Sequence, residues 1–160
     1  MENLLEKESV KRVNDFIKQF DSSLEVVVLA KTAKTAKDAA NALNCDVGAI
    51  VKSLVLKANG NFLLCLIAGD KRCSLNKVKK LIAKKDVSMA AAEQVKSQTG
   101  FSIGGVSPVA HTSKLSVLID KSLQRFQNVF GAAGHPNCIF KISYGQLVKI
   151  TNGSEEEISE

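Results

Sequence analysis

The stretch Gly104-Gly105-Val106-Ser107-Pro108 is the part of the sequence best suited to hold a ligand with main-chain groups. Glycine permits positive φ angles and lets a ligand approach the backbone closely. Proline fixes its own φ and favours an extended conformation in the residue before it. This composition therefore predicts a rigid loop with free N–H groups, although glycine and proline also cluster in plain surface turns.

Lys52 is a charged residue inside an apolar run, Ile50–Leu56. The alternation of side chains along a strand places Lys52 on the same face as Leu54. An ammonium group is costly to bury unless it reaches solvent or an anion. Two interpretations remain open, a lysine that extends outward to solvent and a cation presented inside a cleft to a phosphate or carboxylate.

A second turn of small residues spans 131–137 and contains the remaining proline. Within it, Gly134, His135 and Asn137 are candidates for contact with a ligand, and a histidine can donate or accept hydrogen bonds near neutral pH. A histidine beside proline is also a common turn residue. Asp120 ends an apolar run and is an ordinary acid at the end of a strand unless another group lies beside it.

A dense basic run follows the second predicted strand of a hairpin. It contains Lys71, Arg72, Lys77, Lys79, Lys80, Lys84 and Lys85. On a helix, Lys77, Lys80 and Lys84 would share one face. Most such faces are simply solvated, but this one can also follow a nucleic-acid backbone with salt-dependent affinity. Aromatic residues are not interleaved with it, which disfavours binding of single strands by base stacking.

The composition is that of a globular protein, with 160 residues of which 45% are apolar and 24% charged, and a net charge of +6 that suits a polyanion partner. The sequence shows no signal peptide and no apolar run of about 18 residues, which predicts a soluble cytoplasmic protein without a membrane partner. Its cysteines show no CxxC or Cys/His ligand spacing. We therefore expect free, reduced thiols and neither a metal nor a cofactor.

Periodicity and turn signals predict helices at 5–20, 35–43, 74–82, 90–99 and 145–151, and strands at 25–30, 49–58, 61–68, 115–120, 128–132 and 138–143. Asn59-Gly60 predicts a hairpin turn. Strands occur singly and in hairpins without regular βαβ alternation. The predicted fold class is α+β, a mixed, strongly curved or barrel-like β-sheet surrounded by helices. We expect one domain, 1–160, with a flexible acidic tail at 154–160.

These motifs together resemble the YbaK/ProX family of aminoacyl-tRNA deacylases, stand-alone relatives of the editing domain of bacterial prolyl-tRNA synthetases. The resemblance covers about 33–153. It is carried by the order and spacing of Val51-Lys52-Ser53-Leu54-Val55, the loop 104–108, Asp120 and the turn 131–137. It implies a YbaK-like fold and hydrolysis of the ester between tRNA and a wrong small amino acid, such as alanine, serine, threonine or cysteine.

The resemblance also implies roles for the motif residues. Lys52 is expected near the terminal adenosine and its phosphate, and the N–H groups of loop 104–108 are expected to hold the aminoacyl carbonyl. Asp120 and His135 would line the pocket. An aminoacyl ester is already activated, so its hydrolysis needs a placed water and oxyanion donors more than a strong nucleophile. Where many relatives carry glycine, this chain has Ala110, which bears on the selectivity of the pocket.

The implied partner is aminoacyl-tRNA, and a synthetase is a second candidate partner. Two other functions remain open. A non-catalytic tRNA- or synthetase-binding module of the same fold would also need the basic run. A small-molecule esterase without an RNA partner is disfavoured, because the sequence contains no recognisable nucleophile motif.

Overall fold

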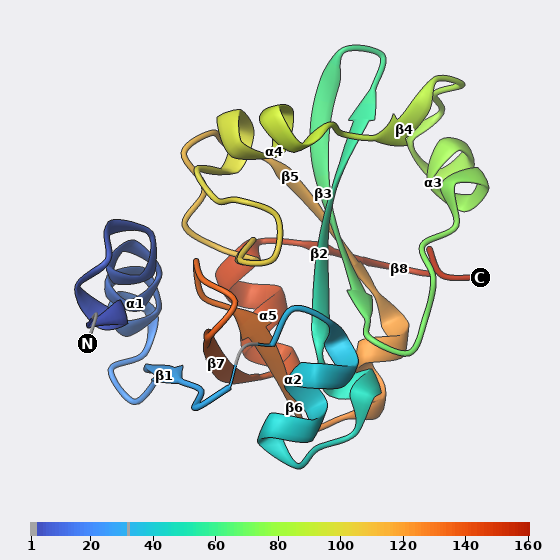
Figure 1. Ribbon diagram of the computed structural model, residues 1–160. Coiled ribbons are helices and arrows are strands. Elements are labelled where there is room, and N and C mark those ends of the chain that lie inside the picture. The colour runs from blue at the N-terminus through green and yellow to red at the C-terminus, as the bar shows by residue number, and fades with distance from the viewer. Residues whose placement is uncertain (1–2, 32) are drawn as a thin grey trace.

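The computed structural model describes residues 3–31 and 33–160 (Figure 1). The α-helices are α1 (Glu8–Phe20), α2 (Ala36–Leu43), α3 (Leu75–Ile82), α4 (Ala92–Thr99) and α5 (Tyr144–Thr151). The strands are β1 (Val26–Val28), β2 (Val51–Ala58), β3 (Asn61–Ala68), β4 (Val87–Met89), β5 (Ser116–Asp120), β6 (Asn128–Ala132), β7 (Cys138–Ser143) and β8 (Ser154–Glu156). Short 3-10 turns occur at Leu4–Glu6, Val47–Ala49 and Lys121–Arg125. All predicted helices and strands are present, and β4 and β8 are additional.

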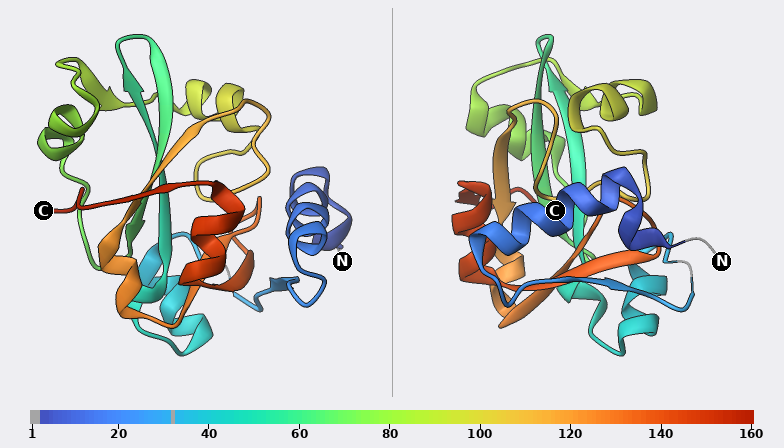
Figure 2. Two further views of the ribbon diagram at one scale, coloured as in Figure 1. Left: turned by 180° about the vertical axis from the view of Figure 1, so that it is seen from behind. Right: turned by 90° about the vertical axis from the view of Figure 1, so that its left-hand side faces the viewer.

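The strands form two sheets that lie across one another (Figures 1 and 2). The larger sheet has the order β4-β2-β3-β5-β8, with β3–β5 and β5–β8 parallel and the other pairs antiparallel. The smaller sheet, β1-β7-β6, is antiparallel. A bridge between Ile50 and Phe130 joins β2 to β6. The mixed α+β class is confirmed, but the described strands do not close into a barrel, since β4 and β8 end the larger sheet.

Local sequence signals account for most boundaries. Asn59 and Gly60 have φ of 50° and 88°, as a tight hairpin requires. The hydroxyl groups of Thr35 and Ser74 cap α2 and α3 by accepting hydrogen bonds from main-chain N–H groups. The prediction for Lys84 is wrong, because α3 ends before it and leaves it outside the helix.

Two apolar clusters hold the elements together. The main cluster joins the larger and smaller sheets to α1, through residues such as Ile17, Leu66 and Phe140, which are fully buried or nearly so. A second cluster packs Val78 of α3 against the opposite face of the larger sheet, including Leu56. Helix α3 and the main core therefore lie on opposite sides of that sheet. No helix in the described part of the chain is long and apolar enough to cross a membrane.

The prediction of a flexible tail at 154–160 is wrong. Strand β8 pairs in parallel with β5, and the side chain of Ile158 is fully buried. The carboxylate of Asp120 accepts hydrogen bonds from the N–H groups of Ile158 and Ser159, at 2.8 and 3.0 Å. The tail was missed because a run of acidic residues carries no apolar periodicity, and a single isoleucine is a weak signal.

Candidate active site

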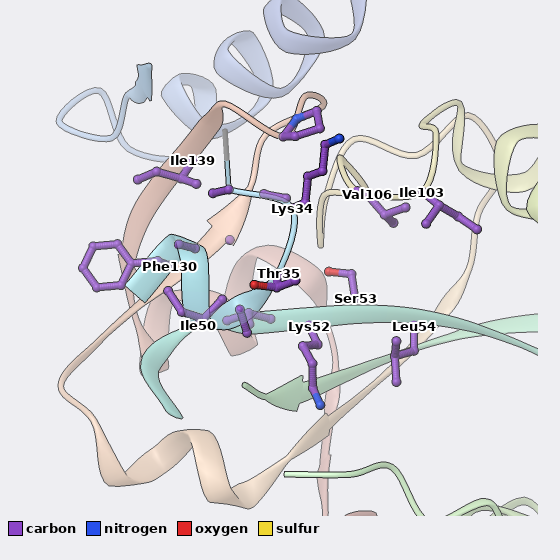
Figure 3. A pocket seen from close by; sticks show the side chains of 18 of the residues that line it. Lys34, Thr35, Ile50, Lys52, Ser53, Leu54, Ile103, Val106, Phe130 and Ile139 are labelled. Atoms are coloured by element: carbon purple, nitrogen blue, oxygen red, sulfur yellow. The ribbon is translucent and has the colours of Figure 1, made fainter. Parts of the chain in front are cut away.

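A cavity of about 370 Å³ opens beside β2, between the start of α2, the loop before Pro108, and strands β6 and β7 (Figure 3). Most of its wall is apolar. The lining residues are Ala33, Lys34, Thr35, Ala36, Ala39, Ile50, Val51, Lys52, Ser53, Leu54, Val55, Met89, Ala90, Val95, Ile103, Gly104, Val106, Phe130, Gly131, Ala132, Pro136, Cys138 and Ile139. No carboxylate belongs to this set, so the cavity favours electron-rich or anionic groups over cations.

The floor of the cavity is the stretch of β2 between its bridge to β6 and its pairing with β4, where the outer edge has no partner strand among the described residues. Strand β4 pairs only with the far end of β2, and beyond that pairing the N–H of Ala90 donates to the carbonyl of Val55 at 3.0 Å. In an antiparallel ladder, alternate residues direct both main-chain polar groups to the same side. The N–H and carbonyl groups of Ser53 therefore point, like those of Val55, away from β3, whereas Val51 adjoins the bridge to β6.

Ser53 adds a hydroxyl group to this open edge. Its Oγ is the one buried side-chain nitrogen or oxygen in the described residues without a hydrogen-bond partner. Figure 3 shows the side chain of Ser53 rising from β2 into the space bordered by Lys34, Thr35 and Val106. The mostly apolar cavity is thus lined by a residue whose hydroxyl has no partner among the described residues.

The loop that begins at Gly104 supplies hydrogen-bond donors from another wall. Its turn is fixed by a bond from the N–H of Gly105 to the carbonyl of Ser102, at 3.0 Å. Gly104 has φ of 100°, a conformation that favours glycine. Gly104 and Val106 line the cavity, and their N–H groups have no acceptor among the described residues. Two donors are therefore free to bind an oxygen atom in the cavity.

The two glycine-rich turns pack directly against each other. The N–H of Gly134 donates to the carbonyl of Gly105 at 3.0 Å. A Cβ added at Gly105 would lie 2.8 Å from both the carbonyl carbon of Gly134 and the nitrogen of His135. Since real Cβ atoms do not approach backbone so closely, only glycine allows this contact. Residues that the sequence analysis singled out separately are thus brought together.

The remaining residues of the two turns lie behind the cavity wall. Ser107 is fully buried, and its Oγ accepts a hydrogen bond from the N–H of Val109 at 3.1 Å. The ring of Pro108 lies against Gly131, where an added Cβ would meet it at 3.1 Å. The N–H of Asn137 donates to Nδ1 of His135 at 3.0 Å. These groups shape the turns, but Ser107, Pro108, His135 and Asn137 do not belong to the cavity lining.

Side chains of helix α1 hold both glycine-rich segments in place through hydrogen bonds to their carbonyl groups. Nε of Arg12 donates to the carbonyl of Ala110 at 2.8 Å, and Oγ of Ser9 donates to the carbonyl of Gly134 at 2.9 Å. Nε2 of His111 lies 2.7 Å from the carbonyl oxygen of Ser107, and burial lowers the pKa of His111 below its usual 6.5. At neutral pH this histidine is therefore uncharged and holds the loop.

Ala110 has φ of 65°, in the left-handed region where a Cβ is unfavourable. A glycine at this position would adopt the same conformation without that cost. Alanine at position 110 therefore places backbone strain next to the loop 104–108. Ala110 itself does not belong to the cavity lining.

Lys52 leaves β2 on the side opposite to Ser53 (Figure 3). Lys52 belongs to the cavity lining, but its Nζ donates to the carbonyl of Lys71. Burial lowers the pKa of Lys52, and the nearby carboxylate of Asp70 partly offsets that effect. Strand alternation thus predicted its face correctly, on the side of Leu54, and the structure places the ammonium group outside the cavity.

Asp120 and the basic run also lie away from the cavity. Asp120 lines a second hollow of about 420 Å³ together with Lys71, Lys77 and Arg125. Its carboxylate binds the tail and the N–H and hydroxyl of Ser122. The basic residues of α3 lie across the larger sheet from the cavity, because α3 packs on the opposite face. These positions do not support contact between Asp120 and a ligand in the cavity.

Sequence reasoning did not assign roles to Ser53, Lys34, Thr35 and Ile103, which border the cavity. Ser53 is part of the strand motif 51–55. Because side chains alternate along a strand, its position next to Lys52 indicated that the two side chains point to opposite faces. Lys34 is exposed at the cavity opening, and Ile103 is 66% exposed. Within residues 3–31 and 33–160, no group of three or more His, Cys, Asp or Glu side chains is placed to hold a metal ion.

Comparison with known proteins connects this geometry to one family. The family model described as an aminoacyl-tRNA editing domain matches residues 30–150. The uncharacterized protein YwhH of Bacillus subtilis strain 168 is 29% identical over 140 residues, which cover 87% of this chain and 88% of YwhH. The proline–tRNA ligase of Thermosipho africanus strain TCF52B is 32% identical over 89 residues, which cover 56% of this chain and only 16% of the ligase.

Solved structures with the same fold cover nearly the whole chain. The crystal structure of a proposed trans-editing enzyme for prolyl tRNA synthetase has a TM-score of 0.91 at 34% identity, and the match covers 96% of this chain and 98% of that one. The crystal structure of the hypothetical protein APE2540 has a TM-score of 0.86 at 31% identity, over 93% of this chain and 99% of that one.

Proposed function

Because the chain belongs to the family of aminoacyl-tRNA editing domains, we propose that its cavity hydrolyses the ester bond of tRNA carrying a wrong, small amino acid. The observation that carries this proposal is the pair of N–H groups on Gly104 and Val106, two residues that line a mostly apolar cavity and whose N–H groups have no acceptor among the described residues. The likeness to a proposed trans-editing enzyme for prolyl tRNA synthetase supports the proline tRNA as the substrate, with hydrolysis occurring in trans.

Oxyanion stabilisation is the chemistry that this site offers. When water attacks the aminoacyl carbonyl carbon, negative charge develops on the carbonyl oxygen. Main-chain N–H groups fixed in advance stabilise that charge, and the loss of one such donor typically costs about 2.7–4 kcal/mol in the barrier. The bond between the carbonyl carbon and the ribose oxygen then breaks, which releases the amino acid and leaves a free hydroxyl on the tRNA.

The apolar wall supports selection by size. Side chains such as those of Ile50, Val55 and Ile139 leave limited room beside the ester. A hydrophobic pocket distinguishes one methylene by only about 1–3 kcal/mol. Alanine, serine, threonine and cysteine therefore all remain within the proposed substrate range.

Lys34 is the cation best placed to meet the RNA backbone at the opening of the cavity. It is exposed, it borders the cavity, and Figure 3 shows it opposite Ile103 and Val106. Lys52 was expected in this role, but its ammonium group binds the carbonyl of Lys71. We therefore assign the contact with the terminal phosphate to Lys34, with Lys52 supporting β2 from the other side.

Replacing Lys34 by alanine is expected to raise the KM for aminoacyl-tRNA several-fold. The loss of one phosphate contact should also reduce the slope of log affinity against log salt by about 1. Steady-state deacylation measured over a range of salt concentrations provides both values. Lys37→Ala is the matched control, because Lys37 is exposed on α2 but does not border the cavity. Equal salt slopes for Lys34→Ala and the wild type would contradict the assignment.

The basic run Lys71–Lys85 remains a second candidate contact for the tRNA. Its residues on α3 lie across the sheet from the cavity, so only a large substrate that passes around the sheet could contact both. If α3 contacts the tRNA, replacing Lys77 and Lys80 together by neutral residues should raise the KM for the whole tRNA. The deacylation rate of a short acceptor-stem fragment should stay unchanged.

The alternative is a module of the same fold that binds tRNA or a synthetase without hydrolysis. Incubation of the purified chain with a panel of mischarged tRNAs separates the two functions. Release of free amino acid supports the deacylase, whereas binding without release supports the module.

A further inference from the structure

The hydroxyl of Ser53 is the one polar side-chain group of the described residues that is buried and unpaired. It lies on the open edge of β2, beside its own main-chain carbonyl, and faces the cavity (Figure 3). Buried polar groups in proteins are nearly always hydrogen-bonded, to protein or to water. The position of Ser53 therefore calls for a small polar occupant of the cavity.

Ser53 is poorly suited to attack an ester itself. A serine nucleophile needs a base within hydrogen-bond reach to take its proton. The cavity lining contains no histidine and no carboxylate, and His135, a candidate from the sequence, uses its Nδ1 to accept a bond from the N–H of Asn137. The hydroxyl of Ser53 is thus suited to bind a reactant by a hydrogen bond and not to form a covalent intermediate.

A water molecule is the occupant that fits these groups best. Ser53 offers an unpaired Oγ that can accept a hydrogen bond, and the loop residues Gly104 and Val106 offer N–H donors without an acceptor among the described residues. Water can donate a hydrogen bond to the Oγ of Ser53, whereas the aminoacyl carbonyl oxygen can only accept hydrogen bonds, here from the N–H groups of the loop. The two walls are therefore complementary to the two partners of the reaction, with water on β2 and the carbonyl oxygen on the loop.

We propose that Ser53 binds the water that attacks the aminoacyl ester. This inference rests on the deacylase function proposed above. The oxygen of the held water forms a bond to the carbonyl carbon, and the bond from that carbon to the ribose oxygen breaks. A proton of the water passes to the ribose oxygen, so the products are the free amino acid and deacylated tRNA. Ser53 is unchanged at the end of the reaction.

The variant Ser53→Ala tests this role by separating rate from binding and from stability. The kcat should fall by about 100-fold, because a misplaced reactant typically costs that much, while KM stays as in the wild type. The thermal unfolding midpoint should stay equal or rise, because the removed hydroxyl makes no bond within the described residues. Ser53→Thr, which keeps a hydroxyl at the same place, should recover most of the rate.

Ser88→Ala is the matched control, since Ser88 is an exposed strand serine on β4 outside the cavity lining. A wild-type kcat in Ser53→Ala would overturn the proposal. So would a raised KM with unchanged kcat, which would mean that Ser53 contacts the substrate instead of the water. A lowered unfolding midpoint that accounts for the lost rate would assign Ser53 a structural role. If the wild type releases no amino acid from any mischarged tRNA, the deacylase function itself fails, and this outcome is distinct from the others.

Discussion

Gly105→Ala should lose roughly 100-fold in deacylation rate while remaining folded. The added Cβ would lie 2.8 Å from main-chain atoms of Gly134 and His135, so one of the two turns must move. The N–H of Val106 directly follows Gly105 and would move with it. Displacement of about 1 Å at a reacting centre can cost this much. Single-turnover deacylation gives the rate, and urea unfolding should show a loss of about 1–3 kcal/mol from overpacking.

Gly145→Ala is the control for Gly105→Ala. Gly145 lies in α5, where an added Cβ meets no atom within 4 Å. This variant should keep the wild-type rate and gain about 0.5–1 kcal/mol of stability, because alanine suits a helix better than glycine does. A folded Gly105→Ala with the wild-type rate would show that the contact between the two turns is irrelevant to hydrolysis.

Asp120→Ala should be the most destabilising of the variants discussed, with a loss of about 3 kcal/mol in the free energy of unfolding. The carboxylate accepts from the N–H groups of Ile158, Ser159 and Ser122, and Ile158 is fully buried. Each buried donor left unpaired costs about 1–3 kcal/mol, reduced where water can reach it. The deacylation rate of the folded fraction should change little, because Asp120 does not line the cavity.

The acid dependence of stability gives a second test for Asp120. Burial opposes its ionisation, but hydrogen bonds from Ser122, Ile158 and Ser159 outweigh burial, and its pKa lies below the usual 3.8. The folded state thus holds its proton less tightly than the unfolded state. The resulting stabilisation is present above pH 3.8 and is lost as pH falls through the folded pKa. The Asp120→Asn variant should not show this loss of stability at low pH, whereas Asp86→Asn, at an exposed site, should still show it.

Local signals were sufficient for most of the fold. The Asn59-Gly60 turn, the caps at Thr35 and Ser74, and the left-handed Gly100 depend on interactions within a few residues, and each is present in the structure. Strands β4 and β8 were missed because each has only three residues, too few for a strand periodicity to be recognised.

The candidate site was predicted in part. The resemblance indicated the two glycine-rich turns, and the contact between Gly105 and Gly134 shows why they belong together. It could not show which main-chain groups are already paired within the protein. The bond of the Lys52 ammonium group to Lys71, the open edge of β2 and the unpaired Oγ of Ser53 depend on which neighbours each strand acquires. These are tertiary properties that no local pattern encodes.

The release of free amino acid from mischarged proline tRNA tests the central claim most directly. Wild-type protein and Gly104→Val should be compared at equal concentrations of folded chain, with alanine, serine, threonine and cysteine esters. Gly104 has φ of 100° at the cavity wall, so valine there disturbs the donor loop. We predict that the wild type releases at least one of these amino acids and that Gly104→Val releases it far more slowly. Absence of release by the folded wild type, or equal release by both proteins, would contradict hydrolysis in this cavity.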